Sequence, residues 1–175
     1  PKPADWDRNL RSVCEVRKQT LALAVDHLRQ LLDPNDPDSY ASTKPEQMGR
    51  VYFSLAQLLA YQGQMDPAIR EWLKAYQLAQ TQAPQMVPEL EEVLGTAYLH
   101  KSEMENDVYH KPGDRCIFPP LKPFRYQKTE DSEKAIFYLT KFLEKKSDAL
   151  EVKWLLNLAY MTLGKYPAGV PSKYL

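Results

Sequence analysis

The stretch that decides the fold is residues 46–80, EQMGRVYFSLAQLLAYQGQMDPAIREWLKAYQLAQ. Its apolar residues recur three and four positions apart, which places them on one face of a helix. The stripe comprises Tyr52, Leu55, Ala56 and Leu59, followed by Ala68, Trp72, Ala75 and Leu78. The pattern predicts two amphipathic helices that pack through this stripe, with small residues allowing a close approach.

The residues between the two predicted helices indicate a tight turn. Gly63 predicts the end of the first helix, because glycine adopts a left-handed conformation without a steric penalty. Asp66 followed by Pro67 predicts the start of the second helix, with Asp66 as the N-cap and a proline that needs no hydrogen-bond donor.

This hairpin resembles a tetratricopeptide (TPR) repeat, whose pattern includes an alanine followed four residues later by a large aromatic, here Ala68 and Trp72. A second match lies at 94–98, which fits the Leu-Gly-x-x-Tyr pattern of a repeat's first helix. Gly95 is costly inside a helix, so it predicts the close approach of another helix backbone. The resemblance implies an all-α, right-handed superhelix of antiparallel helix pairs. For residues 46–80 alone, an ordinary helical hairpin is the alternative.

The rest of the chain fits one TPR-like domain spanning residues 1–175. The expected segments are an N-terminal helix at 4–32 capped by Asp5, repeat 1 at 46–80, repeat 2 at 87–145, and the start of repeat 3 at 148–175. Pro34 and Pro37 make 33–44 a polar linker. Pro167 and Pro171 block a further helix, so the array stops within a repeat and we expect chain beyond Leu175.

Repeat 2 contains a long irregular insertion at 102–130. Its apolar residues, such as Phe118 and Tyr126, favour a loop packed on the protein, and Pro112-Gly113-Asp114 predicts a tight turn within it. The insertion also holds Cys116, while the other cysteine, Cys14, lies in the first helix. Two interpretations stay open: separate thiols buried as small apolar groups, or a disulfide between Cys14 and Cys116.

Composition excludes several classes of protein. Apolar residues make up 43% and charged residues 26%, which is typical of a globular chain. Lys+Arg and Asp+Glu both total 23, so there is no electrostatic case for nucleic acid or an anionic membrane. No run reaches the roughly 18 apolar residues of a spanning helix, so we expect no transmembrane segment.

No motif for catalysis is present: the sequence lacks a glycine-rich phosphate loop, GxSxG, HExxH and CxxC. We therefore predict no enzyme, no catalytic residue, no cofactor and no metal. His100, His110, Asp114 and Cys116 match no common metal-site spacing. Three acidic residues lie at the start of repeat 2, where their negative charge would stabilise the positive end of the helix dipole. They are Glu89, Glu91 and Glu92.

The stronger candidate is a binding groove, because the first helix of each repeat lines the concave side of such arrays. When equivalent positions of the repeats are aligned, eight candidate partner-binding residues fall on this concave side. They are Arg50, Phe53, Gln57, Glu89, Glu92, Thr96, Trp154 and Met161. Phe53 and Trp154 are aromatic anchors suited to a peptide or loop, and the set lacks the lysine and asparagine of chaperone-binding carboxylate clamps. Two arrangements stay open: a free groove, or one filled by the aromatic insertion.

Two strings carry a narrower resemblance: Cys116-Ile117-Phe118-Pro119, and 154–167, WLLNLAYMTLGKYP. Together with the repeats they resemble the N-terminal TPR region of secreted bacterial proteins that continue into FG-GAP (VCBS-type) propeller repeats and an ASPIC/UnbV segment. The resemblance implies an exported, periplasmic or extracellular setting and a binding role, without established catalytic residues.

Three functions are compatible with these patterns. The favoured one is a non-catalytic scaffold that binds a partner protein or a downstream domain of its own chain. The second is an accessory structural subunit of a larger exported multiprotein complex. The third is a metal-binding or enzymatic fragment that uses the 102–130 loop. No particular oligomeric state is indicated.

Overall fold

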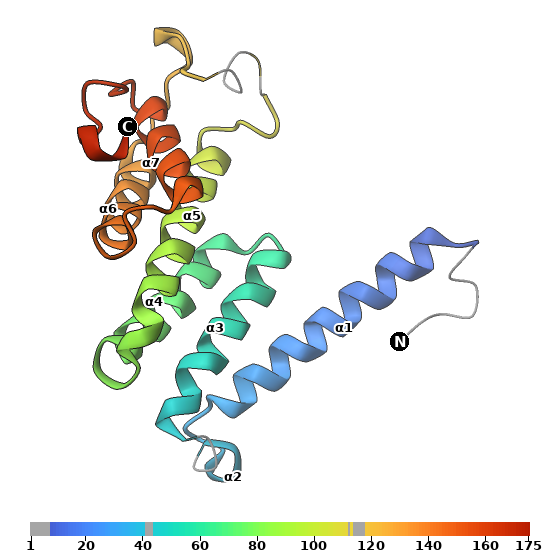
Figure 1. Ribbon diagram of the computed structural model, residues 1–175. Helices are drawn as coiled ribbons and strands as arrows, with labels where there is room; N and C mark the ends of the chain where they lie inside the picture. Colours follow the sequence, from blue (N-terminus) through green and yellow to red (C-terminus); the bar gives the residue numbers. More distant parts are fainter. Residues whose placement is uncertain (1–7, 41–43, 112, 114–117) are drawn as a thin grey trace. The chain divides into compact units, whose positions relative to one another are not determined.

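The computed structural model describes residues 8–40, 44–111, 113 and 118–175 (Figure 1). In these residues all regular secondary structure is helical and no strand occurs, which confirms the all-α prediction. The chain divides into two compact units, Pro1–Gln82 and Ala83–Leu175. The division falls between the predicted first and second repeats.

Helix α1 spans Leu10–Leu31. The side chain of Asn9 caps it, accepting a hydrogen bond of 3.0 Å from the backbone N–H of Ser12. The predicted start at residue 4 is therefore too early, and the predicted cap Asp5 lies outside the described residues. Within α1 only Val25 is buried, so most of this helix lies at the surface of its unit.

The predicted linker at 33–44 contains one short helix, α2, Pro37–Tyr40. Asp36 precedes it and accepts hydrogen bonds from the side chain of Gln30 (3.0 Å) and the N–H of Ser39 (3.2 Å). These bonds, the one from Gln30 first, lower the pKa of the Asp36 carboxyl. Asp36 thus caps α2 and is hydrogen-bonded to α1.

Helices α3 (Pro45–Tyr61) and α4 (Met65–Gln82) form the predicted antiparallel hairpin (Figure 1). Gly63 in the turn has a φ of 75°, so the predicted left-handed stop is confirmed. The predicted N-cap at Asp66 is wrong: α4 already begins at Met65, and the N–H of Ala68 bonds to the carbonyl of Gln64. The predicted stripe is buried at Leu55, Ala56, Leu59, Ala68, Trp72 and Ala75.

The second unit begins with the short η1 (Pro84–Met86) and is built on helices α5 (Val87–Glu105) and α6 (Glu130–Lys145), which pack along each other. The two helices approach closely at Gly95. A Cβ added there would lie 2.6 Å from Leu139 Cγ and 3.2 Å from the Leu139 backbone nitrogen. This confirms that Gly95 marks the approach of another helix backbone.

The insertion between α5 and α6 is held at its base by Asn106. The side-chain oxygen of Asn106 accepts the backbone N–H groups of Gln127 (2.8 Å) and Lys128 (3.1 Å). Tyr126 is buried and its N–H bonds to the carbonyl of Thr162. The short η3 (Lys122–Phe124) precedes it. The described part therefore packs on the protein as predicted, while the predicted turn at Pro112 and Asp114 lies outside the described residues.

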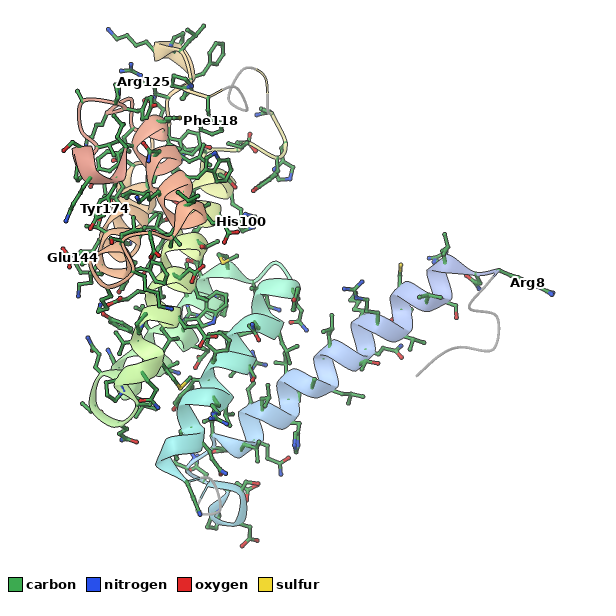
Figure 2. The ribbon with its side chains drawn as sticks, viewed as in Figure 1. Arg8, His100, Phe118, Arg125, Glu144 and Tyr174 are labelled. Carbon is green, nitrogen blue, oxygen red and sulfur yellow. The ribbon has the colours of Figure 1, made fainter. Side chains whose placement is uncertain are left out.

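Helix α7 (Leu150–Thr162) packs against α6 and α5. The hydroxyl of Thr162 lies 2.9 Å from that of Ser132, joining α7 to α6 in the buried core. The final residues fold back as η4 (Ser172–Tyr174) on α7, where Tyr174 is buried (Figure 2). The Asn157 side chain donates a 2.8 Å bond to the Tyr174 carbonyl. No α-helix follows the two prolines, as predicted.

Candidate protein-binding site

Among the predicted site residues, Trp154 on α7 is a large apolar side chain with 63% of its surface accessible. Leu150, one turn earlier on the same face, is 76% exposed. The opposite face of α7 carries the buried stripe of Val152, Leu156 and Ala159. Two large apolar side chains therefore point away from the core, which is typical of a surface that contacts another chain.

A shallow hollow of about 430 Å³ lies on this face, lined by Leu150, Glu151, Trp154 and Leu155. We call these four residues the α7 face. Its lining is almost entirely apolar, and Glu151 contributes the one charge. Glu151 has no ion-pair partner within the described parts of the chain. The α7 face thus offers an aromatic anchor beside an unpaired carboxylate.

The other predicted residues of the second unit lie outside this hollow. Met161, near the end of α7, is half-buried and does not line the hollow. On α5, Glu89 and Thr96 are exposed and Glu92 is half-buried. The hydroxyl of Thr96 already donates a 2.9 Å hydrogen bond to the Glu92 carbonyl. Since α5 and α7 contact each other, these candidates lie on neighbouring helices.

The candidates on α3 lie in the first unit. Arg50 and Gln57 are exposed, and Phe53, the second predicted anchor, is half-buried. Their spacing places all three on one side of α3. These three residues belong to the first compact unit and the α5 candidates to the second, so a groove continuous across α3 and α5 stays a prediction, as does its filling by the insertion.

A second apolar hollow, which the sequence reasoning missed, lies between α1 and the end of α3. It has a volume of about 540 Å³. We call its main lining the α1 face: Cys14, Arg17, Lys18, Leu21, Ala22 and Tyr61. A stripe at residues 14, 18, 21 and 25 follows the spacing of one helix face, and only its last member, Val25, is buried. The remainder extends along α1 as an open surface.

The sequence reasoning also misassigned Glu91. We expected it to complement the dipole of α5, but it is only 1% exposed and lies inside the α5–α6 contact. Lys145 of α6 donates to both carboxylate oxygens, at 2.7 and 2.6 Å. A second buried carboxylate, Asp131, pairs with Lys101 at 2.6 Å. These are structural ion pairs that join α5 to α6.

Tyrosines pack beside this ionic contact. The rings of Tyr98 and Tyr138 stack with centroids 5.7 Å apart, and Lys134 lies over Tyr98. Burial, followed by the charge of Tyr98, raises the pKa of Tyr138 above its ordinary value. Phe137 stands edge-on to Tyr138 and is exposed on the outer side of α6. This cluster fixes the α5–α6 contact rather than forming a recess.

The residues considered for metal binding form local contacts at the surface. Tyr109 donates to Glu103 and lies 2.9 Å from the Nδ1 of His100, which is exposed on α5 (Figure 2). His110 contacts Asp107. In the described ranges no three His, Cys, Asp or Glu side chains are arranged to hold a metal. Cys116 and Asp114 lie outside those ranges.

Only one of the two cysteines, Cys14, lies in the described residues. Cys14 is exposed on α1 as a free thiol, and Cys116 lies outside the described residues. The Cys14–Cys116 disulfide therefore stays a prediction.

No protein-family model, curated protein or solved structure matches this chain at a significant level. Among the described helices, none has the length and apolar character needed to cross a bilayer.

Proposed function

We propose that this chain is a non-catalytic protein-interaction scaffold of the TPR type, whose helix pairs stack as a right-handed superhelix. One observation carries the proposal: Trp154 and Leu150 are 63% and 76% exposed on adjacent turns of a helix whose other face is fully packed. Burying a tryptophan contributes strongly to protein–protein affinity, and such anchors are enriched at the centres of interfaces.

The close α5–α6 contact at Gly95 supports the repeat assignment, because Gly95 is the glycine of the Leu-Gly-x-x-Tyr pattern. The short α3–α4 turn at Gly63 supports a helix pair. We assign no catalytic residue and no cofactor. The partner is another protein chain or a downstream domain of this one. An exported location rests on the family resemblance alone, and fractionation of the source cells tests it.

Photo-crosslinking in cells that make the full-length protein tests the binding role. A benzophenone amino acid replaces Leu150, which lies one turn from Trp154. We expect a discrete covalent adduct with a protein, or with a distant segment of the same chain, and we expect Trp154→Ala to remove it. Phe53→Ala extends the same test to α3.

Phe137 provides the matched control, since it is an aromatic side chain that is 51% exposed on α6. The benzophenone placed at Phe137, and the variant Phe137→Ala, should leave the α7 adduct as it is. Adducts that are the same from both positions, or that persist in Trp154→Ala, would overturn the proposal.

A further inference from the structure

We propose that the α7 face of one copy of this chain binds the α1 face of a second copy, in a head-to-tail contact. This inference rests on the proposed function, because it names the partner of the Trp154 surface. It goes beyond that function in stating that the partner is this chain itself and which helix receives Trp154.

Shape is the first reason. The α7 face presents two protruding side chains, Trp154 and Leu150, over a shallow apolar surface. The α1 face is the larger hollow, and its walls are Leu21, Ala22 and Tyr61. Tyr61 is 73% exposed, so its ring is available to pack against an indole. A protruding aromatic on one surface and an apolar recess on the other form a complementary pair.

Helix patterning is the second reason. In the C-terminal half of α1, the stripe that contains Val25 packs on α3. Towards the N-terminus of α1 the same stripe continues through Leu21, Lys18 and Cys14. This continuation is suited to receive another helix in the same manner. Helix α7 is suited to be the helix that is received, because it packs on α5 and α6 with one side and exposes apolar side chains on the other.

Charge decides between the possible pairings. Glu151 on the α7 face is acidic, and Arg17 and Lys18 on the α1 face are basic. Within the described residues none of the three has an ion-pair partner. An α7–α7 contact would bring two glutamates together, and an α1–α1 contact would bring four cations together. The α1–α7 contact instead pairs opposite charges at its rim.

A contact between two different faces leaves one face open at each end, so association continues past the dimer unless a ring closes. Sedimentation or light scattering of the purified chain should show a mean mass that rises beyond the dimer over about 1–200 µM, the range of an interface of modest affinity. Trp154→Ala should weaken this association roughly 30-fold, as expected for a central anchor.

Mixing two variants provides the sharp test. The first is Trp154→Ala, which disables the α7 face. The second is Arg17→Glu with Lys18→Glu, which disables the α1 face. At a concentration near the Kd of the wild type, each variant alone should be almost entirely monomeric. An equimolar mixture should instead form a dimer that does not grow, because one intact face remains on each copy. All the altered side chains are exposed, and circular dichroism confirms that the variants are folded.

Matched controls are Phe137→Ala for the aromatic change, and Lys122→Glu with Lys128→Glu for the two charge reversals, since both lysines are exposed and line neither hollow. Both controls should associate like the wild type. A wild-type chain that stays monomeric, a variant that still associates alone, or a mixture that stays monomeric would each overturn the inference. If monomers persist while Leu150 still crosslinks to a different protein, the proposed function stands and this partner assignment fails.

Discussion

Replacing Gly95 with alanine tests the close contact between α5 and α6. Gly95 lies inside α5, where alanine is the better helix former by about 1 kcal/mol. On propensity alone, Gly95→Ala should therefore stabilise the protein. The packing at this position predicts the opposite sign.

The magnitude follows from the atoms that the new methyl group would meet. A Cβ at this position lies 2.6 Å from both Cγ and Cδ2 of Leu139 and 3.2 Å from its backbone nitrogen. Leu139 is fully buried, so its side chain has little room to move, and the backbone contact prevents a simple rotamer change. Overpacking of this kind costs about 1–3 kcal/mol. After the propensity gain, we expect a net destabilisation of about 1 kcal/mol.

Gly49 is the matched control, because it also lies inside a helix, α3, and an added Cβ would meet no atom within 4 Å. Gly49→Ala should stabilise by about 0.5–1 kcal/mol. Urea unfolding measures both variants, and hydrogen exchange resolves peptides of α3 and α5 in the same chain. A Gly95→Ala protein as stabilised as Gly49→Ala would refute the close contact.

A double-mutant cycle tests whether the contact with Leu139 causes the destabilisation of Gly95→Ala. Leu139→Ala alone should cost about 2–5 kcal/mol. In the Gly95→Ala background the same truncation should cost at least about 1 kcal/mol less, since the added methyl group then fills part of the space that the leucine leaves. Additive effects would show that the two residues do not contact each other.

Three further predictions concern the second unit. Lys145→Met leaves the carboxylate of Glu91 buried without its cation and should cost about 1–3 kcal/mol in urea unfolding, whereas Lys145→Arg should cost less. Asn106→Ala removes the bonds that close the insertion and should cost about 1–2 kcal/mol and speed proteolysis there. Because the folded pKa of Tyr138 lies above its unfolded value of 10.0, stability should fall as pH rises above about 10. Tyr138→Phe should flatten that fall, and a profile that the substitution leaves unchanged would exclude Tyr138 as its source.

Local signals in the sequence predicted the helices well. The start and end of α3, its stop at Gly63 and the buried stripe across α3 and α4 depend on side-chain spacing and on the backbone freedom of glycine. The same holds for Gly95, where an unfavourable residue in a helix indicated a neighbour. The prediction at Asp66 places the start of α4 two residues too late, because capping side chains and first-turn acidic residues are alike in sequence.

Partners distant in sequence could not be predicted from such signals. Glu91 lies between Glu89 and Glu92 at the start of a helix, and nothing local distinguishes the buried member of the three. Its partner, Lys145, is 54 residues away. The pairing depends on how α5 and α6 align, and that alignment is fixed by packing along the whole contact.

Whether an apolar stripe becomes a core or a binding surface depends on its neighbours, and α7 illustrates this. Val152, Leu156 and Ala159 are buried because α5 and α6 lie against them. Leu150 and Trp154 have comparable apolar character but point the other way. A helix that is apolar on two faces is typical of the interior of a helical array, where it has neighbours on both sides. Within the second unit, α5, α6 and η4 pack on α7 and leave Leu150 and Trp154 exposed, so the exposed tryptophan is the physical reason to expect a second chain or segment there.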